Sequence, residues 1–176
     1  MSSLDNTPQI IERSPQPYVG IRESVTMSTL SSVADRVPEL LDWLAQHGET
    51  PSGAAFFRYL TIDMERELEV EAGVPVAVPL DLADRAGSAV TAGTLPGGRF
   101  VRAFFVGHPD GLENATAELL KWAETHGLRW DMNDSPVGER WGCRLEIYHS
   151  DPIEDPDMNT WRTELAFRLA DGAIPS

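Results

Sequence analysis

The sequence has 176 residues, 41% of them hydrophobic, which is enough to bury a core in one ordinary domain or two very small ones. Asp and Glu total 28 against 14 for Lys and Arg, and a formal net charge of −14 repels phosphate backbones, which argues against direct binding of nucleic acid. The single cysteine, Cys143, excludes an internal disulfide, and no charged leader or long apolar run is present, so we expect a soluble, cytoplasmic protein that does not contact a membrane.

The first half of the chain predicts four elements in the order strand, helix, strand, strand. Apolar residues recur at helical spacing, and Gly48 is typical of a helix end. Pro38 lies inside this pattern, so the regular helix either kinks there or begins close to it. The expected elements are a strand over residues 18–27, a helix over 30–47 and strands over 54–62 and 66–78.

The second half, from about residue 88, repeats that order. The helical segment 40–48 matches 119–127 at a constant offset of 79, with Leu, Leu, Trp, His and Gly coinciding. Neither half, with one helix, could bury its sheet alone. We therefore predict an α+β fold of tandem pseudo-symmetric repeats, residues 8–80 and 88–170, forming a single domain with a central cleft between the halves. The matching strands of the second half are expected at 100–107, 145–151 and 161–169.

Residues 144–152 carry the most informative pattern, an alternating strand with a carboxylate in its middle. Leu145 and Ile147 point to one face of the sheet, while Glu146 and Tyr148 point to the other. If Leu145 and Ile147 pack on a helix, Glu146 faces the opposite side of the sheet. That side is where we expect a ligand.

Several motifs, taken in order over residues 8–170, resemble the GyrI-like small-molecule-binding domains. This family includes gyrase-inhibitory protein and the effector-binding domains of AraC-type and multidrug-sensing regulators. Besides the paired helix motifs, the matching segments are Gly-Ala-Ala-Phe-Phe-Arg-Tyr (53–59), Leu-Pro-Gly-Gly-Arg-Phe (95–100), Glu-Ile-Tyr-His-Ser-Asp-Pro (146–152) and Trp-Arg-Thr-Glu-Leu-Ala-Phe-Arg-Leu (161–169).

The resemblance implies a cleft that takes lipophilic, often cationic compounds, stacked by aromatic side chains and countered by a glutamate, which is Glu146 in this sequence. The family's regulators attach a helix-turn-helix region, whereas here the repeats begin within the first twenty residues. A ligand-binding part standing alone is therefore expected. Some members resemble hydrolases that open strained cyclopropane rings with a cleft glutamate, so Glu146 is also the candidate catalytic residue.

Arg58 complicates the simple cation site. Aligning Asp63 with Asp151 places Arg58 at the repeat position of Glu146, and the two could pair near the pseudo-two-fold axis. The aromatic candidates for ligand stacking each have core packing as their alternative. The full set of expected ligand-binding residues is Glu146, Tyr148, Trp161, Trp141, Phe56, Arg58 and Phe104.

The remaining chemistry-bearing residues favour structural roles. His47 and His126 end their helices, where an imidazole suits the last carbonyl groups. No His or Cys pair has zinc spacing, and no phosphate loop or nucleophile motif occurs, so neither a metal nor a cofactor is expected. Cys143 is interpreted as core filler.

Three functions stay open on the sequence alone. The first is a binder of lipophilic, drug-like or cationic small molecules for sensing, sequestration or resistance. The second is a hydrolase of strained electrophiles that uses Glu146. The third is a protein-interaction module whose acidic surface shields a partner such as gyrase. The sequence leaves monomer and dimer equally open.

Overall fold

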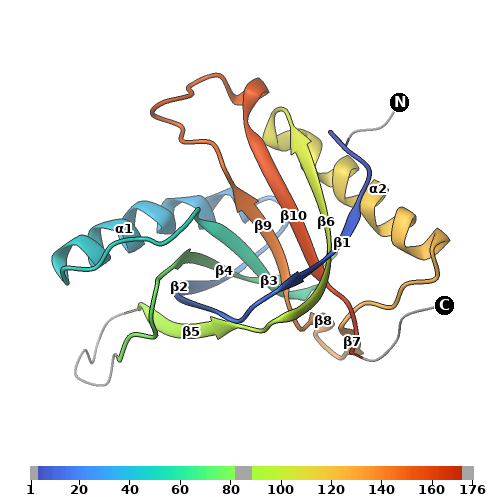
Figure 1. Cartoon of the computed structure of the whole chain (residues 1–176), viewed down its shortest axis with the longest axis horizontal. Coiled ribbons are helices and arrows are strands. Elements are labelled where there is room, and N and C mark those ends of the chain that lie inside the picture. The colour runs from blue at the N-terminus through green and yellow to red at the C-terminus, as the bar shows by residue number, and fades with distance from the viewer. Residues whose placement is uncertain (1–3, 82–88, 172–176) are drawn as a thin grey trace.

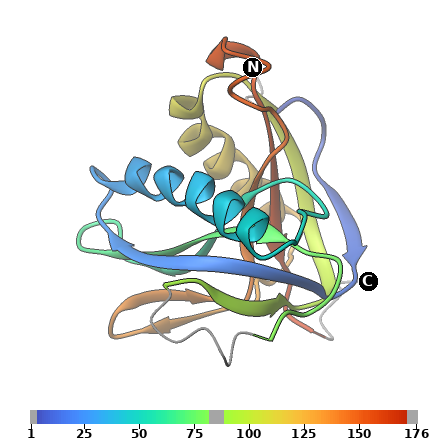
Figure 2. The same ribbon diagram turned by 90° about the vertical axis from the view of Figure 1, so that its left-hand side faces the viewer.

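The computed structural model describes residues 4–81 and 89–171. They form a curled antiparallel sheet of ten strands with two α-helices packed on one of its faces (Figures 1 and 2). The strands are β1 (Gln9–Arg13), β2 (Gln16–Val25), β3 (Phe56–Ile62), β4 (Leu68–Pro75), β5 (Thr91–Leu95), β6 (Gly98–Val106), β7 (Met132–Ser135), β8 (Gly138–Trp141), β9 (Arg144–Tyr148) and β10 (Arg162–Arg168). The helices are α1 (Arg36–Gln46) and α2 (Leu112–Thr125). The α+β class predicted from the sequence is therefore confirmed.

The strand order exchanges two edge strands between the halves of the chain. Along the sheet the order is β1-β6-β10-β9-β3-β4-β2-β5, and the β7–β8 hairpin branches from β3. β1 precedes β2 in sequence but pairs with β6, whereas β5 precedes β6 but pairs with β2. The central contact, between β3 and β9, brings the first half against the second.

A proline near the start of α1 and a glycine after each helix fit the observed helix ends. A short 3₁₀ helix (Leu30–Asp35) leads into α1, so Pro38 falls in the first turn of α1, where its missing N–H is not needed. This confirms the expectation that the regular helix begins close to Pro38. Both helices are followed by a glycine in the left-handed region, Gly48 with φ +70° and Gly127 with φ +66°.

Alternation along the strands separates the buried side chains into two clusters. The larger cluster contains the helix residues Leu40, Leu44, Leu112 and Leu119 and defines the helix face of the sheet. The smaller cluster contains no helix residue and lies on the opposite face; its buried members are Tyr18, Phe56, Leu95, Phe100, Cys143, Leu145, Ile147 and Ala166. The chain therefore has apolar packing on both faces of one sheet.

The expected placement of Glu146 on the face away from the helices was wrong. Leu145 and Ile147 belong to the opposite-face cluster, so they do not pack on a helix, and Glu146 lies on the helix face instead. Residues 131–140, for which no element was predicted, mostly form the β7–β8 hairpin, which pairs with β3 through Thr61 and Arg140. Its polar composition fits a short edge ribbon with little burial.

Candidate functional site

The two central strands carry the candidate site because the helices lie to either side of them. α1 packs chiefly on β4 and β2, and α2 packs on β6. β3 and β9 lie between these regions, as Figure 1 shows. Across the β3–β9 pair Phe57 lies opposite Glu146, and across β9–β10 Leu165 lies opposite Glu146. Glu146 therefore points to the helix face, in the middle of the sheet.

The carboxylate of Glu146 is held by two tyrosine hydroxyls. Tyr148 Oη donates to Glu146 Oε1 over 2.7 Å, and Tyr59 Oη donates to the same oxygen over 2.9 Å. Only 9% of Glu146 is exposed. Within the described residues no Lys, Arg or His nitrogen lies within 4.0 Å of this carboxylate. The phenol ring of Tyr148 meets the ring of Phe57 edge-on, with the ring centroids 5.0 Å apart.

Burial dominates the proton affinity of this group. It raises the pKa of Glu146, although the hydrogen bonds from Tyr148 and Tyr59 and the charge of Arg144 act in the lowering direction. Burial and the neighbouring Glu146 carboxylate also raise the pKa of Tyr59 and of Tyr148 well above the usual tyrosine range. Both phenols therefore stay protonated and act as neutral donors to a carboxylate that has lost most of its hydration.

Arg144 brings a cation into the same region without pairing to Glu146. Its guanidinium carbon lies 4.6 Å from the ring centroid of Phe167, 4.7 Å from that of Trp141 and 5.7 Å from that of Tyr59. Burial lowers the pKa of Arg144, against the opposing effect of Glu146. Its buried Nε atom has no hydrogen-bond partner among the described residues. Aromatic faces thus replace most of the water around this charge.

We call the helix-face group of Glu146, Tyr59, Tyr148, Phe57 and Arg144 the Glu146 compartment. The ligand-binding residues expected from the sequence included neither Tyr59 nor Arg144. The signal for both was strand alternation. Arg144 lies two residues before Glu146, and Tyr59 lies two residues after Phe57, the cross-strand partner of Glu146. Using that signal required the register between β3 and β9.

Arg58 does not pair with Glu146. It lies opposite Leu145 and so points to the opposite face, where it donates to Tyr18 Oη over 3.0 Å and to the Gly142 carbonyl over 2.9 Å. The aligned repeats placed Arg58 one position away from the residue that faces Glu146 across the strand pair. One residue of register moves a side chain to the other face of a sheet.

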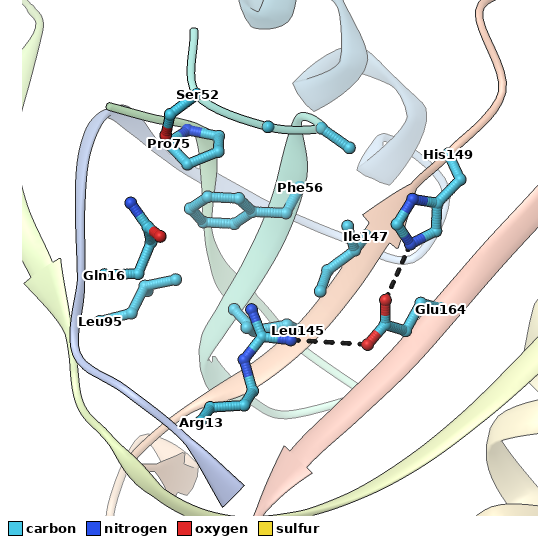
Figure 3. A pocket seen from close by; sticks show the side chains of 12 residues that line it. Arg13, Gln16, Ser52, Phe56, Pro75, Leu95, Leu145, Ile147, His149 and Glu164 are labelled. Carbon is cyan, nitrogen blue, oxygen red and sulfur yellow. Dashed lines mark hydrogen bonds and ion pairs between the residues drawn. The ribbon is translucent and has the colours of Figure 1, made fainter. Parts of the chain in front are cut away.

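The other predicted site residues separate onto different regions. Trp141 joins the helix-face cluster beside Trp130 and Phe167, with both ring centroids 5.7 Å away. Phe56 and Phe104 lie on the opposite face, and Phe56 lines a cavity there (Figure 3). Trp161 belongs to neither cluster and donates its indole N–H to the Asp155 carbonyl over 2.7 Å. The structure therefore brings Glu146 and Tyr148 together but not the whole predicted set.

The histidines and the cysteine have structural surroundings. His47 stacks on Trp43 and His126 stacks on Trp122, each with ring centroids 4.1 Å apart. The Nδ1 atoms of both histidines lie 2.7 Å from the carbonyls of the same tryptophans, at the helix ends, which confirms the predicted capping role. Burial raises the pKa of Cys143 to about 11, so its thiol is a poor nucleophile.

Residues 4–81 and 89–171 contain no group of three or more His, Cys, Asp or Glu side chains placed to hold a metal ion. In the same part of the chain no helix has the length and apolar content needed to cross a bilayer.

Comparison with known protein structures shows the same fold in proteins of low sequence identity. The C-terminal domain of EcmrR has a TM-score of 0.69 at 18% identity, covering 93% of this chain and 97% of that domain. EcmrR in its complex with DNA has a TM-score of 0.73 at 18% identity, and this chain covers 57% of its length. SAV2435 bound to tetraphenylphosphonium has a TM-score of 0.65 at 11% identity, covering 94% of this chain and 95% of that one.

A hydrolase from Listeria innocua is also similar, with a TM-score of 0.56 at 16% identity, covering 93% of this chain and 91% of that one. Comparison with curated protein sequences gave no significant match. The family model of the GyrI-like small-molecule-binding domain matches residues 6–170 of this chain. The chain therefore belongs to the family of GyrI-like small-molecule-binding domains.

Proposed function

We propose that this protein binds lipophilic small molecules, cations among them, in the Glu146 compartment, and that it acts in the cytoplasm by sensing or sequestering them. The observation that carries the proposal is the state of Glu146. A carboxylate that is 9% exposed is held by two neutral hydroxyls, with no cation in ion-pair range among the described residues. Such a group gains from an incoming positive charge.

The aromatic surroundings suit the same class of ligand. Tyr59, Tyr148 and Phe57 offer flat faces beside the carboxylate, and a cation over such a ring gains about 0.5–2 kcal/mol. Because Glu146 is nearly covered, a ligand reaches it only when side chains above it move. The tetraphenylphosphonium bound to SAV2435 is a lipophilic cation of the expected kind, although that similarity supports the fold alone.

We infer that the compartment lies at the junction of two pseudo-symmetric repeats within one domain. Read from either edge, the sheet has the same order: an exchanged edge strand, the strand before the helix, the last strand of the half and then a central strand. Glu71 on β4 and Glu164 on β10 take equivalent places in this order, each two strands from its edge. In this order the central strands β3 and β9 lie between the strands on which the two helices pack.

The test compares a cation with a neutral analogue of similar shape. Tetraphenylphosphonium and triphenylphosphine oxide would be titrated calorimetrically into wild type and Glu146→Gln. We expect the substitution to weaken the cation by about tenfold or more and to change the neutral compound little. Glu113→Gln, an exposed carboxylate on α2, controls for the change in net charge. Equal affinity of wild type and Glu146→Gln for the cation would contradict the proposal.

A second candidate function, hydrolysis of strained cyclopropane-type electrophiles, is favoured by the raised pKa of Glu146. A protonated carboxyl could donate its proton to the carbon released as the ring opens, while water adds to the electrophilic carbon and returns a proton to Glu146. Mass analysis of a cyclopropane-bearing electrophile after incubation separates the two functions. Water added by wild type but not by Glu146→Gln would establish the hydrolase, and unchanged recovery from both would exclude it for that compound.

A further inference from the structure

A cavity of about 180 Å³ lies on the opposite face of the sheet, away from Glu146 (Figure 3). Its walls include the buried side chains of Phe56 on β3, Leu145 and Ile147 on β9, and Leu95 on β5, all of which belong to the small apolar cluster. A cavity of this volume has room for about six groups the size of a water molecule. Its apolar walls favour a short hydrocarbon or a single ring.

One end of the cavity is polar, and its carboxylate, Glu164, is already contacted by a histidine and an arginine. Glu164, 7% exposed, has its Oε1 atom 2.8 Å from His149 Nε2 and its Oε2 atom 3.5 Å from Arg13 Nη1. Figure 3 shows the two contacts converging on the carboxylate from either side. Unlike Glu146, this buried carboxylate has cationic or proton-donating partners, so it does not call for a cationic ligand.

Two further arginines lie beside that polar end without a carboxylate partner. Phe104 is the cross-strand neighbour of Glu164, and its ring centroid is 4.0 Å from the guanidinium carbon of Arg162 and 5.4 Å from that of Arg102. The ring of His149 is 6.2 Å from the same phenyl ring. Arg162 is exposed, and Arg102 contacts Gln9 Oε1 at 3.4 Å.

Neither of these arginines makes an ion pair within 4.0 Å in the described part of the chain, and the buried Nε of Arg102 has no hydrogen-bond partner there. Among the side chains just named, the three guanidinium groups of Arg13, Arg102 and Arg162 face a single carboxylate, that of Glu164. Apolar walls next to unpaired guanidinium groups are complementary to an amphiphile with an anionic head.

From this arrangement we infer a second binding site, for a small amphiphilic carboxylate. Its apolar body, a chain of about six to eight carbons or one aromatic ring, occupies the cavity against Phe56, Leu145 and Ile147. Its carboxylate lies at Arg102 and Arg162, outside the Arg13–Glu164–His149 group. The site is separated from the Glu146 compartment by the thickness of the sheet, and it does not depend on the function proposed for that compartment.

The test uses three probes with the same hydrocarbon chain and different heads: octanoate, 1-octanol and octylamine. Calorimetric titration of wild type should show saturable binding in the order octanoate, octanol, octylamine. The double variant Arg102→Gln/Arg162→Gln should weaken octanoate by about tenfold and leave octanol unchanged. The matched control Arg66→Gln/Arg140→Gln removes two exposed arginines elsewhere, with the same change in net charge, and should keep wild-type affinity.

Two more variants locate the binding. Ala54→Leu places extra volume in the cavity lining and should weaken both octanoate and octanol, with circular dichroism confirming that the variant is folded. Glu146→Gln should leave octanoate affinity unchanged. The inference would be overturned if octanoate failed to saturate, if octylamine bound more tightly, or if Glu146→Gln rather than the arginine variant altered octanoate binding. Failure of tetraphenylphosphonium to bind would count against the Glu146 proposal alone.

Discussion

Glu146 and Glu164 are buried carboxylates on neighbouring strands, 9% and 7% exposed, yet their surroundings differ. Glu146, on the helix face, has two neutral phenols as donors, and the nearby Arg144 is held by aromatic rings instead of by the carboxylate. Glu164, on the opposite face, is contacted by His149 and Arg13. Two carboxylates of nearly equal burial therefore differ in their partners among the described residues: Glu146 has only neutral donors within hydrogen-bond distance, whereas Glu164 has an arginine and a histidine.

The largest expected effect tests whether the opposite face is packed core. Leu145→Ala removes a side chain that is 1% exposed and enlarges the cavity it lines. We expect the free energy of unfolding to fall by about 2–5 kcal/mol in urea titrations. Binding of tetraphenylphosphonium by the fraction that stays folded should be unchanged. A loss below about 1 kcal/mol would contradict tight packing on this face.

The next effect compares the donors to the two carboxylates. Tyr59→Phe removes one of the hydroxyls that satisfy Glu146 in a buried setting and should cost about 1–3 kcal/mol of unfolding free energy. His149→Ala removes the matching donor to Glu164 from a partly exposed position, where water can take its place. It should cost less than Tyr59→Phe. Equal costs in chemical denaturation would remove the distinction between the two carboxylates.

Arg144 gives a sharper test of charge on the helix face. Arg144→Met keeps an unbranched apolar side chain against Trp141 and Phe167 but removes the resident cation. With the resident cation gone, tetraphenylphosphonium should bind about tenfold more tightly to this variant. Triphenylphosphine oxide serves as the neutral control and should bind as before. A weaker cation affinity in Arg144→Met would show that the arginine supports the ligand and does not compete with it.

The smallest effect is a dependence of stability on pH. Because burial raises the pKa of Glu146 in the folded state, its bound proton favours folding fully below the ordinary glutamate pKa of about 4.5. That contribution is lost as the pH rises through the higher pKa of the folded state, with a slope of at most about 1.4 kcal/mol per pH unit. Urea titrations from acidic to neutral pH should show the loss in wild type but not in Glu146→Gln. Parallel pH profiles would contradict it.

The sequence predicted those parts of this fold that depend on local patterns. The helix-end segments, the strand around Glu146 and the α+β class follow from the spacing of residues such as Leu40, Leu119 and Gly48. The face of the sheet on which Glu146 lies did not follow, because alternation shows that Leu145 and Glu146 point apart but not which of them meets the helices. Arg58 was misplaced for a related reason, since aligned repeats do not fix the register between β3 and β9 to a single residue.

The exchanged edge strands have a consequence for how the molecule can come apart. Only Ser14 and Pro15 separate β1, which completes the sheet of the second half, from β2, which belongs to the first, and Pro96 and Gly97 join β5 to β6 in the same way. Each half thus contributes one edge strand to the sheet of the other half. A chain cut near residue 85 would yield two fragments that are each missing a border strand, and we expect them to recover the native fold only when mixed. We therefore expect the two halves to stay joined while side chains and helices move, because separating the halves would require releasing both exchanged strands together.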